Sequence, residues 1–309
     1  MLQLLLTRLL STAIVILGVV CLVFMLIHLV PGDPVDVMLG ENAQMADREA
    51  LRESLGLNRP VGEQLLTYIG NLAQGDLGQS LHSREPVASM IMERLPATFQ
   101  LALVSLLVAC LLAFPLGIVA ALNKGEAWDK TAMGVSLLGV SIPNFLLGPI
   151  LILIFSISFG WLPVSGKNGI ASMILPAVTL GTALAAILSR MVRSTLLEVL
   201  HEDYIRTAQA KGLSYIKVVV FHALPNAMLP IITLLGLQLG VLLGGAVITE
   251  TVFSWPGIGK LTIDAIAKRD YPVVQGCVLL ISVTYVAVNV FTDILYEWID
   301  PRIRLGADS

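Results

Sequence analysis

Long apolar runs dominate the pattern of the chain, and shorter polar stretches separate them. A transmembrane helix needs about 20 consecutive, mostly apolar residues. Six runs approach or exceed that length, the fourth being the shortest: residues 9–30, 98–122, 131–157, 172–189, 227–249 and 273–298. Within each run the apolar residues do not alternate with polar ones, which favours helices over the strands of a barrel. The pattern therefore predicts an all-α integral membrane protein with six transmembrane helices.

The composition agrees with a membrane protein and narrows the kinds of partner. Of the 309 residues, 56% are hydrophobic and only 13% are charged. Soluble domains usually carry about 25% charged residues. The formal net charge of −3 excludes a strongly basic nucleic-acid-binding protein. The lipid bilayer is therefore an expected partner, and nucleic acid is not.

Basic residues in the short loops predict the orientation of the chain, because cytoplasmic loops carry an excess of Lys and Arg. With the N-terminus inside, the inner segments hold Arg8, Lys124, Lys130, Arg190, Arg193, Arg206, Lys211, Lys217, Arg302 and Arg304. The short outer loops hold only Lys167, Lys260, Lys268 and Arg269. We therefore expect a multi-pass protein with both termini in the cytoplasm and residues 31–95 outside.

The polar segment between the first two runs, residues 31–95, is predicted to be an extracytoplasmic insertion. Two stretches in it, residues 46–56 and 62–75, have the composition and the apolar spacing of short helices. The insertion is either a packed cap or a surface that contacts a partner, and the pattern leaves both interpretations open.

Few polar residues interrupt the six runs. Asn144, Gln238 and Asn289 are uncharged, and they are the candidates to line a pathway through the membrane. Charged residues near the middle of a span mark proton relays and ion-coupled transporters. Their scarcity argues against a secondary transporter that acts alone.

Motifs for nucleotide, metal or nucleophilic chemistry are missing from the sequence. No Gly-x4-Gly-Lys-Ser/Thr loop is present, so we expect this chain to bind no ATP through a P-loop of its own. His201 and Glu202 are followed by Ile205 where a zinc-protease helix would have its second histidine. No Gly-x-Ser-x-Gly elbow occurs either. We therefore expect no enzymatic activity, no metal site and no cofactor bound by this chain.

The stretch of residues 201–230 is amphipathic, although it lies between two apolar runs. Apolar side chains recur at helical spacing opposite charged ones, Gly212 separates two short helical pieces, and Pro225 limits the second piece. Small side chains would let a partner protein approach closely at Thr207, Ala208, Ala210 and Gly212. The competing interpretation is a solvated loop that lies on the lipid headgroups.

A second unusual stretch follows the fifth run. Residues 250–259 read Glu-Thr-Val-Phe-Ser-Trp-Pro-Gly-Ile-Gly, and the stretch to residue 272 is too short and polar to cross a membrane. It nevertheless contains Phe253 and Trp255. One interpretation is a re-entrant turn and a short helix, shielded by protein, at an outer gate. The other is an aromatic anchor at the membrane interface.

Several motifs resemble those of one transporter family. Residues 206–212, Arg-Thr-Ala-Gln-Ala-Lys-Gly, followed nine residues later by His-Ala-Leu-Pro, resemble the EAA loop of binding-protein-dependent ABC importer permeases. The chain is similar to the dipeptide, oligopeptide and nickel permease group at residues 29–34, 75–80, 203–212, 250–259, 268–276 and 300–304. One departure is Arg206, which stands where the general motif has an acid, with Glu202 and Asp203 just upstream.

The resemblance implies the transmembrane domain of a type I ABC importer in the bacterial inner membrane. It implies residues 1–94 as the first helix with the outer segment, residues 95–298 as the permease core, and residues 299–309 as a cytoplasmic tail. The implied partners are a second homologous permease in a heterodimer, two ABC ATPase subunits that bind ATP and Mg²⁺, and an extracytoplasmic substrate-binding protein. Dipeptides or short oligopeptides are the implied cargo, with nickel chelates, glutathione and haem as alternatives.

The resemblance also gives roles to residues, within an alternating-access mechanism that moves a coupling helix as a rigid body. The loop at residues 201–225 would meet an ATPase through Glu202, Asp203, Arg206, Thr207, Ala208, Ala210, Lys211 and Gly212. The outer-gate interpretation adds a set on the side of the binding protein, namely Phe253, Trp255, Pro256 and Gly257. No catalytic or metal-binding residue is implied.

Overall fold

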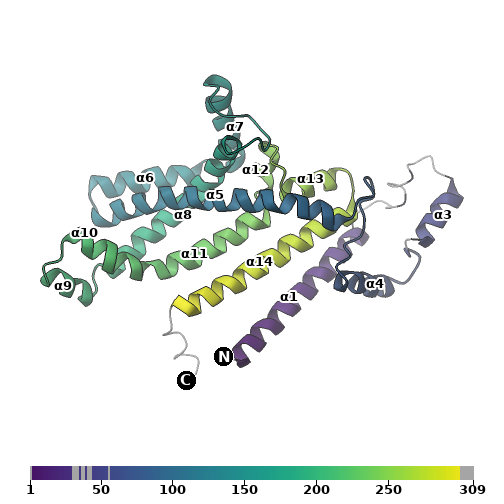
Figure 1. Ribbon diagram of the computed structural model, residues 1–309, viewed down its shortest axis with the longest axis horizontal. Coiled ribbons are helices and arrows are strands. Elements are labelled where there is room, and N and C mark those ends of the chain that lie inside the picture. The colour runs from purple at the N-terminus through teal and green to yellow at the C-terminus, as the bar shows by residue number, and fades with distance from the viewer. Residues whose placement is uncertain (1, 30–34, 36–38, 40–43, 55, 300–309) are drawn as a thin grey trace. The chain divides into compact units, whose positions relative to one another are not determined.

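Figure 1 shows the computed structural model of the chain, which describes residues 2–29, 35, 39, 44–54 and 56–299. Within this described part the regular elements are helices, and the one β contact is a bridge between Gln79 and Pro86. This confirms the all-α prediction. The chain divides into two compact units, Met1–Thr98 with Pro256–Val286, and Phe99–Trp255 with Ala287–Ser309.

The first unit gathers elements from distant parts of the sequence. Its helices are α1 (Leu2–Leu29), α3 (Met45–Ser54), α4 (Val61–Ala73), the first part of α5 (Val87–Leu122), α13 (Ile258–Ala267) and the first part of α14 (Tyr271–Ile299). Helices α3 and α4 confirm the two helices predicted within residues 31–95. The rings of Phe24 in α1 and Tyr68 in α4 have centroids 5.7 Å apart, so α4 packs on α1.

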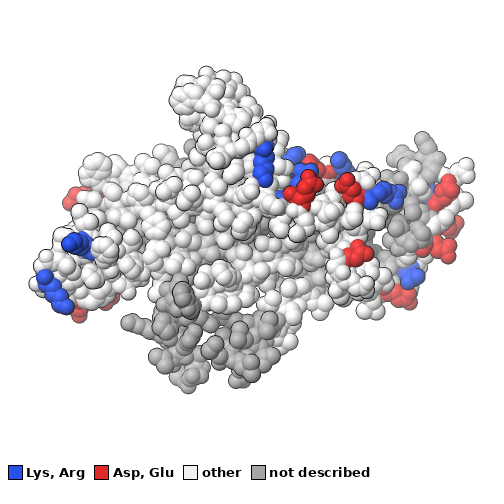
Figure 2. Space-filling view, viewed as in Figure 1, with Lys and Arg blue, Asp and Glu red and all other residues white. Residues whose placement is uncertain are grey.

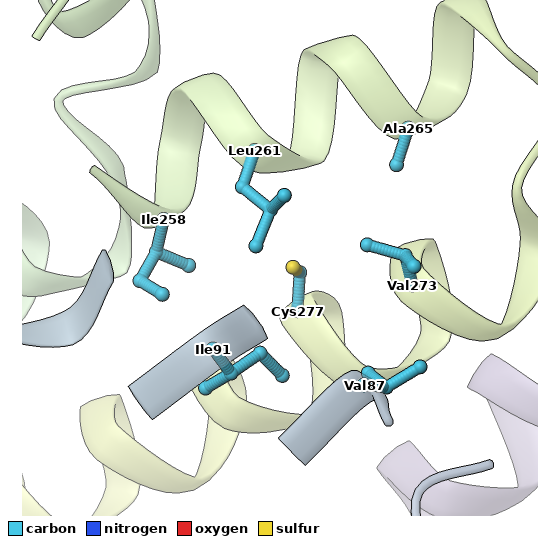
Figure 3. Close-up of a cluster of buried hydrophobic side chains, with 7 residues drawn as sticks. All are labelled: Val87, Ile91, Ile258, Leu261, Ala265, Val273 and Cys277. Atoms are coloured by element: carbon cyan, nitrogen blue, oxygen red, sulfur yellow. The ribbon is translucent and has the colours of Figure 1, made fainter. Parts of the chain in front are cut away.

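Figure 3 shows a buried cluster of this unit, which joins α5, α13 and α14. Its members are Val87, Ile91, Ile258, Leu261, Ala265, Val273 and Cys277. Gly276 of α14 allows the close approach, because a Cβ there would lie 2.5 Å from Val87 Cγ1. Helix α13 has only 10 residues, and isolated helices of that length are marginal in water. The cluster therefore holds α13 in place.

Two of the motifs that carry the resemblance meet in this unit. Ser80 Oγ donates to Asp270 Oδ2 at 2.5 Å, and the Leu81 N–H donates to Asp270 Oδ1 at 3.1 Å. Asp270 is only 3% exposed, and a buried carboxylate needs such donors. The motifs at residues 75–80 and 268–276 thus support each other in the fold.

The second unit consists of long helices together with several short ones. It contains the rest of α5 and α14 and the elements α6 (Ala127–Ser141), α7 (Asn144–Leu151), η1 (Ile152–Ser158), α8 (Ala171–Val199), α9 (Asp203–Ala210), α10 (Tyr215–Val218), η2 (Val219–Ala223), α11 (Leu224–Gly245) and α12 (Val247–Val252). Helix α8 packs against both α6 and α11, as Figure 1 shows, and it is the centre of this unit.

Glycines let α8 lie very close to its neighbours. A Cβ on Gly117 of α5 would lie 2.7 Å from the carbonyl oxygen of Ser189, and one on Gly139 of α6 would lie 2.7 Å from that of Thr182. The hydroxyls of Ser136 and Ser189 also hydrogen-bond between α6 and α8. Small residues and interhelical hydrogen bonds are the means by which helices associate in lipid. The contacts of α8 are those of a membrane bundle.

Four described helices are long and apolar enough to cross a membrane: Val87–Leu122, Ala171–Val199, Tyr215–Gly244 and Tyr271–Thr292. The shortest predicted run thus belongs to a helix of 29 residues. In α1 the described apolar part is Thr12–Met25. Residues 30–34 and 300–309, which include two motifs and nearly all of the tail, lie outside the described residues. The count of six spans stays a prediction.

The third predicted span, residues 131–157, is not one helix. Helix α6 ends at Ser141, and α7 with η1 continues at an angle of 97° to it. Between them Ile142 is extended, with φ −96° and ψ 113°. The ring of Pro143 disfavours the helical conformation in the residue before it. The two pieces together are long and apolar enough for one broken span, and whether they cross the membrane stays a prediction.

The fifth predicted span also differs from the expectation. Pro225 does not end a helix, because α10 continues through the π-turn η2 into α11. Pro225 lies in the first turn of α11, and the wider π-turn before it accommodates the missing N–H. At the other end α11 stops at Gly245, Ala246 leaves the helical conformation, and α12 begins at Val247.

Candidate functional site

The amphipathic stretch forms a helix, a glycine turn and a second helix, as predicted. Glu202 is the N-cap residue of α9, and Asp203 places negative charge at the positive end of the helix dipole. After Gly212 the chain enters α10, with Ser214 at its N-cap. Residues 202–218 are called the α9–α10 segment from here on.

Gly212 makes the turn of this segment possible. Its φ is 81°, which glycine adopts freely and which costs other residues about 1 kcal/mol or more. Its N–H donates to the Gln209 carbonyl at 2.9 Å and closes the end of α9. A Cβ on Gly212 would meet no atom of the chain within 4 Å. The chain itself therefore requires glycine here for its conformation and not for space.

One face of α9 packs inside the chain. Ile205 is fully buried and Ala208 is 8% exposed, in a cluster with Leu196 of α8 and Val218 of α10. Residues three apart share a helix face, so Ala208 follows Ile205 into the core. This corrects the expectation for Ala208: its side chain contacts its own chain and is not on the surface available to a partner.

The opposite face of the α9–α10 segment is exposed. It carries the other residues proposed for coupling, namely Glu202, Asp203, Arg206, Thr207, Ala210, Lys211 and Gly212. Arg206 Nη1 lies 3.5 Å from Asp203 Oδ1, but both side chains are solvated and such a pair contributes little. Ile216 of α10 is 75% exposed. Figure 2 shows charged atoms over α9 and α10 and a white surface over the adjoining long helices.

Tyr204 of α9 forms a side-chain hydrogen bond with Asn226 in the first turn of α11. Tyr204 is 41% exposed, and the partial burial of its side chain raises the pKa of the phenol; the nearby Glu202 raises it further, whereas a hydrogen bond with the Asn226 side chain lowers it. The net pKa is above the ordinary value, so the phenol is neutral at cellular pH. Asn226 Nδ2 also donates to the His222 carbonyl at 2.7 Å.

An ion pair that sequence reasoning missed stands near this segment. Arg193 of α8 donates through Nε and Nη2 to the two oxygens of Asp129 in α6, each at 2.7 Å. The Gly125 N–H donates to Asp129 Oδ2 at 2.9 Å. The sequence pattern marks Arg193 only as a cytoplasmic charge. The sequence does show an acid, Asp129, shortly after an apolar run. Its partner Arg193 lies 64 positions away, so the pattern does not reveal the pair.

The turn after α12 encloses its aromatic side chains. Phe253 is 2% exposed and Trp255 is fully buried. The Phe253 carbonyl accepts the Gly166 N–H at 2.9 Å, and the backbone N–H of Trp255 donates to the Glu250 carbonyl at 2.8 Å. The ring of Phe253 also fills the space beside Gly148 of α7, where a Cβ would lie 3.1 Å from it.

These contacts distinguish the two interpretations of the turn. Pro256 is half-buried, and Gly257 is buried at the N-cap of α13, so a turn and a short helix are present as predicted. Anchoring aromatic residues need to reach the headgroup region. Trp255 is enclosed by protein, so the interpretation as an aromatic anchor is wrong for this residue. The role at an outer gate stays a prediction.

The polar residues of the spans occupy different surroundings. Asn144 and Asn289 each have a buried Oδ1 that accepts no hydrogen bond. Asn144 lines a cavity, described below as a candidate subsite, to which neither Gln238 nor Asn289 contributes in the described part of the chain. In that part no group of three or more His, Cys, Asp or Glu side chains could hold a metal ion.

Apolar helices long enough for a bilayer, joined by an exposed amphipathic segment, define an integral membrane protein. Residues 113–305 match the family described as "Binding-protein-dependent transport system inner membrane component". Residues 1–102 match the description "Binding-prot-dependent transport system membrane comp, N-term". The chain belongs to this family of binding-protein-dependent transport components of the inner membrane.

Three curated relatives align with almost the whole chain. It is 48% identical to the di/tripeptide transport system permease protein DppB of Pseudomonas aeruginosa, over 93% of this chain and 94% of that protein. It is 43% identical to the dipeptide transport system permease protein DppB of Escherichia coli, over 98% and 99%. It is also 43% identical to the glutathione transport system permease protein GsiC of Escherichia coli, over 98% and 99%.

A solved transporter has a similar fold. A chain of the inward-facing methionine ABC transporter MetNI superposes with a TM-score of 0.59 at 17% identity, over 68% of this chain and 96% of that chain. At this identity the likeness shows the fold alone, which is that of an ABC transporter membrane chain.

Proposed function

We propose that this chain is the transmembrane permease subunit of an ATP-driven ABC importer for dipeptides or short oligopeptides. A separate substrate-binding protein delivers the cargo, and a second homologous permease completes the pathway. The observation that carries the proposal is the identity of 43–48% to peptide permeases along nearly the whole chain. The geometry of the α9–α10 segment supports it, because one face of α9 packs against α8 while the opposite face of the segment is exposed to a partner.

In this proposal the α9–α10 segment docks into a groove of one of two ATPase subunits, which bind ATP and Mg²⁺. Both termini and the segment face the cytoplasm, and the six spans lie in the bacterial inner membrane. Ile205 and Ala208 hold the segment to α8, while Arg206, Lys211 and Ile216 are exposed and contact the partner. A movement of the ATPase is then passed to the helices without deforming the loop.

Glutathione is the second candidate cargo. The chain is as similar to the glutathione permease of Escherichia coli as to the dipeptide permease of that organism. Glutathione is itself a tripeptide with an unusual first linkage, so a pathway for peptides accommodates it. Competition between a labelled dipeptide and glutathione distinguishes the two cargoes.

The test compares two substitutions of Gly212 in the complete importer. Gly212→Val forces a branched residue into positive φ, whereas Gly212→Asn keeps a residue that tolerates that conformation. We expect both variants to insert, and Gly212→Val to lose about fivefold or more of ATPase retention and dipeptide uptake, since about 1 kcal/mol is a factor of five. Gly212→Asn should stay close to wild type.

Pull-down of the ATPase subunits and uptake of a labelled dipeptide are the two measurements. Normal assembly and uptake in Gly212→Val would contradict docking through the α9–α10 segment. Uptake by wild type that survives ATP depletion and follows the proton gradient would instead identify a secondary transporter.

A further inference from the structure

A cavity of about 300 Å³ lies within the second unit, between α7, α8, α11 and α12. Its walls come from both sides of the break that separates α11 from α12. The lining residues are Asn144, Leu180, Ala183, Leu184, Val241, Leu242, Ala246, Val247, Ile248 and Thr249. The lining is therefore aliphatic apart from one amide and one hydroxyl.

The amide is the unusual member of this lining. Asn144 Oδ1 is buried and accepts no hydrogen bond in the chain. A buried polar atom without a partner costs about 1–3 kcal/mol, and lipid has no donor to replace water. Asn144 is at the start of α7, directly after the bend at Pro143 that directs α7 away from α6. The structure thus keeps an unsatisfied acceptor at the wall of an apolar cavity.

We propose that this cavity is a cargo subsite, in which an aliphatic side chain of the transported peptide lies against the apolar wall and a peptide N–H donates to Asn144 Oδ1. This inference rests on the proposed function as a peptide permease. The volume is at the lower end of small-molecule sites, which span about 300–1,000 Å³. It therefore suits one side chain with its peptide group and is too small for a haem.

The chemistry of the lining selects this occupant over others. A lipid chain would fill the aliphatic space but brings no N–H for Asn144. A charged side chain would find no opposite charge among the lining residues, and burying it unpaired is costly. A peptide offers both an apolar side chain and a donor. The subsite would prefer large aliphatic cargo, whereas the Asn144 contact is common to all peptides.

The decisive variant fills the cavity and leaves the amide intact. Ala183→Leu adds three carbons to the wall contributed by α8. Ala171→Leu, at an exposed position in the first turn of the same helix, is the matched control. Uptake of Leu-Leu and of Gly-Gly is measured at saturating concentration with the same binding protein. Since that protein is unchanged, an altered ratio of the two rates originates in the permease.

We expect Ala183→Leu to lower Leu-Leu uptake about tenfold relative to Gly-Gly uptake, which is the discrimination that a lost apolar contact gives. Ala171→Leu should leave the ratio unchanged. Asn144→Leu, which removes the acceptor at similar size, should lower the uptake of both dipeptides by a similar factor.

Three results distinguish failure of the subsite from failure of the proposed function. An unchanged ratio in Ala183→Leu, with uptake otherwise normal, overturns the subsite while the peptide function stands. Loss of the second permease in a pull-down from Ala183→Leu overturns it too, because the cavity would then be a subunit interface. Wild type that takes up neither dipeptide overturns the proposed function itself, and with it the inference.

Discussion

The bidentate contact between Asp129 and Arg193 is the strongest polar interaction that joins α6 to α8. Both oxygens of the carboxylate accept from the guanidinium, and the Asp129 side chain is 7% exposed. The Arg193 side chain is 29% exposed, so solvent weakens the pair in part. Arginine suits this geometry because its planar fork matches a carboxylate, which lysine cannot reproduce.

Removal of one partner should therefore be worse than removal of both. We expect Asp129→Leu to lower the free energy of unfolding by about 2 kcal/mol, because it leaves a half-buried cation without its partner. Arg193→Met combined with Asp129→Leu should recover most of that loss, since an apolar pair replaces the ion pair. Thermal unfolding of the purified protein in detergent measures both. A double variant less stable than either single one would contradict this account.

At the scale of residues, the sequence predicts conformation better than contacts. A glycine between two helical pieces predicts the turn at Gly212, and the positive φ of that residue confirms it. The expectation for Ala208 is wrong, because a small residue fits a partner interface and a core equally well. The burial of Ile205 decides between them, and burial depends on α8 and η2, which approach from elsewhere in the chain.

At the scale of elements, the glycines of α5, α6 and α8 set the spacing of the bundle. A Cβ on Gly139 of α6 would face the backbone of Thr182, whereas a Cβ on Gly134, about one and a half turns earlier in the same helix, would meet no atom within 4 Å. The two glycines have the same helix propensity and differ only in what lies opposite them. They form a natural pair for comparison.

We expect Gly139→Val to destabilise the bundle by about 1–3 kcal/mol, the usual cost of overpacking, because its Cβ would lie 2.7 Å from the Thr182 carbonyl oxygen. Gly134→Val should change stability by less than about 0.5 kcal/mol. The melting temperatures of the two variants, taken in one detergent, provide the comparison. Equal losses would mean that helix propensity and not packing governs these positions.

The long apolar helices are predictable from the sequence, but how far each proline bends or ends them is not. Apolar composition continues across Ile142 and Pro143, so a hydropathy pattern cannot separate one span from two helices at 97°. The opposite error concerns Pro225. A proline there predicts the end of a helix, but α10 continues through the π-turn η2 into α11. A proline alters the backbone locally, whereas packing by the neighbours decides whether the helix bends, widens or stops.

At the scale of the whole molecule, orientation is the property still to be measured. Gln74, after α4, and Lys211, after α9, are both exposed and are predicted to lie on opposite sides of the membrane. In a background without Cys21, Cys110 and Cys277, we expect an impermeant thiol reagent on intact cells to label Gln74→Cys and not Lys211→Cys. Opening the membrane should expose both. Labelling of Lys211→Cys in sealed cells would reverse the topology.

The uninterrupted helix from α10 through η2 to α11 has a mechanical consequence. Tyr215–Gly244 is 30 residues, about 45 Å at 1.5 Å per residue. Such a rod behaves as a stiff lever, with the α9–α10 segment at one end and Val241 and Leu242 of the cavity wall at the other. A tilt of about 5° about one end displaces the other by about 4 Å, roughly the width of a methyl group. A small rotation at the end that carries the α9–α10 segment would thus be amplified into opening or closing of a side-chain-sized space.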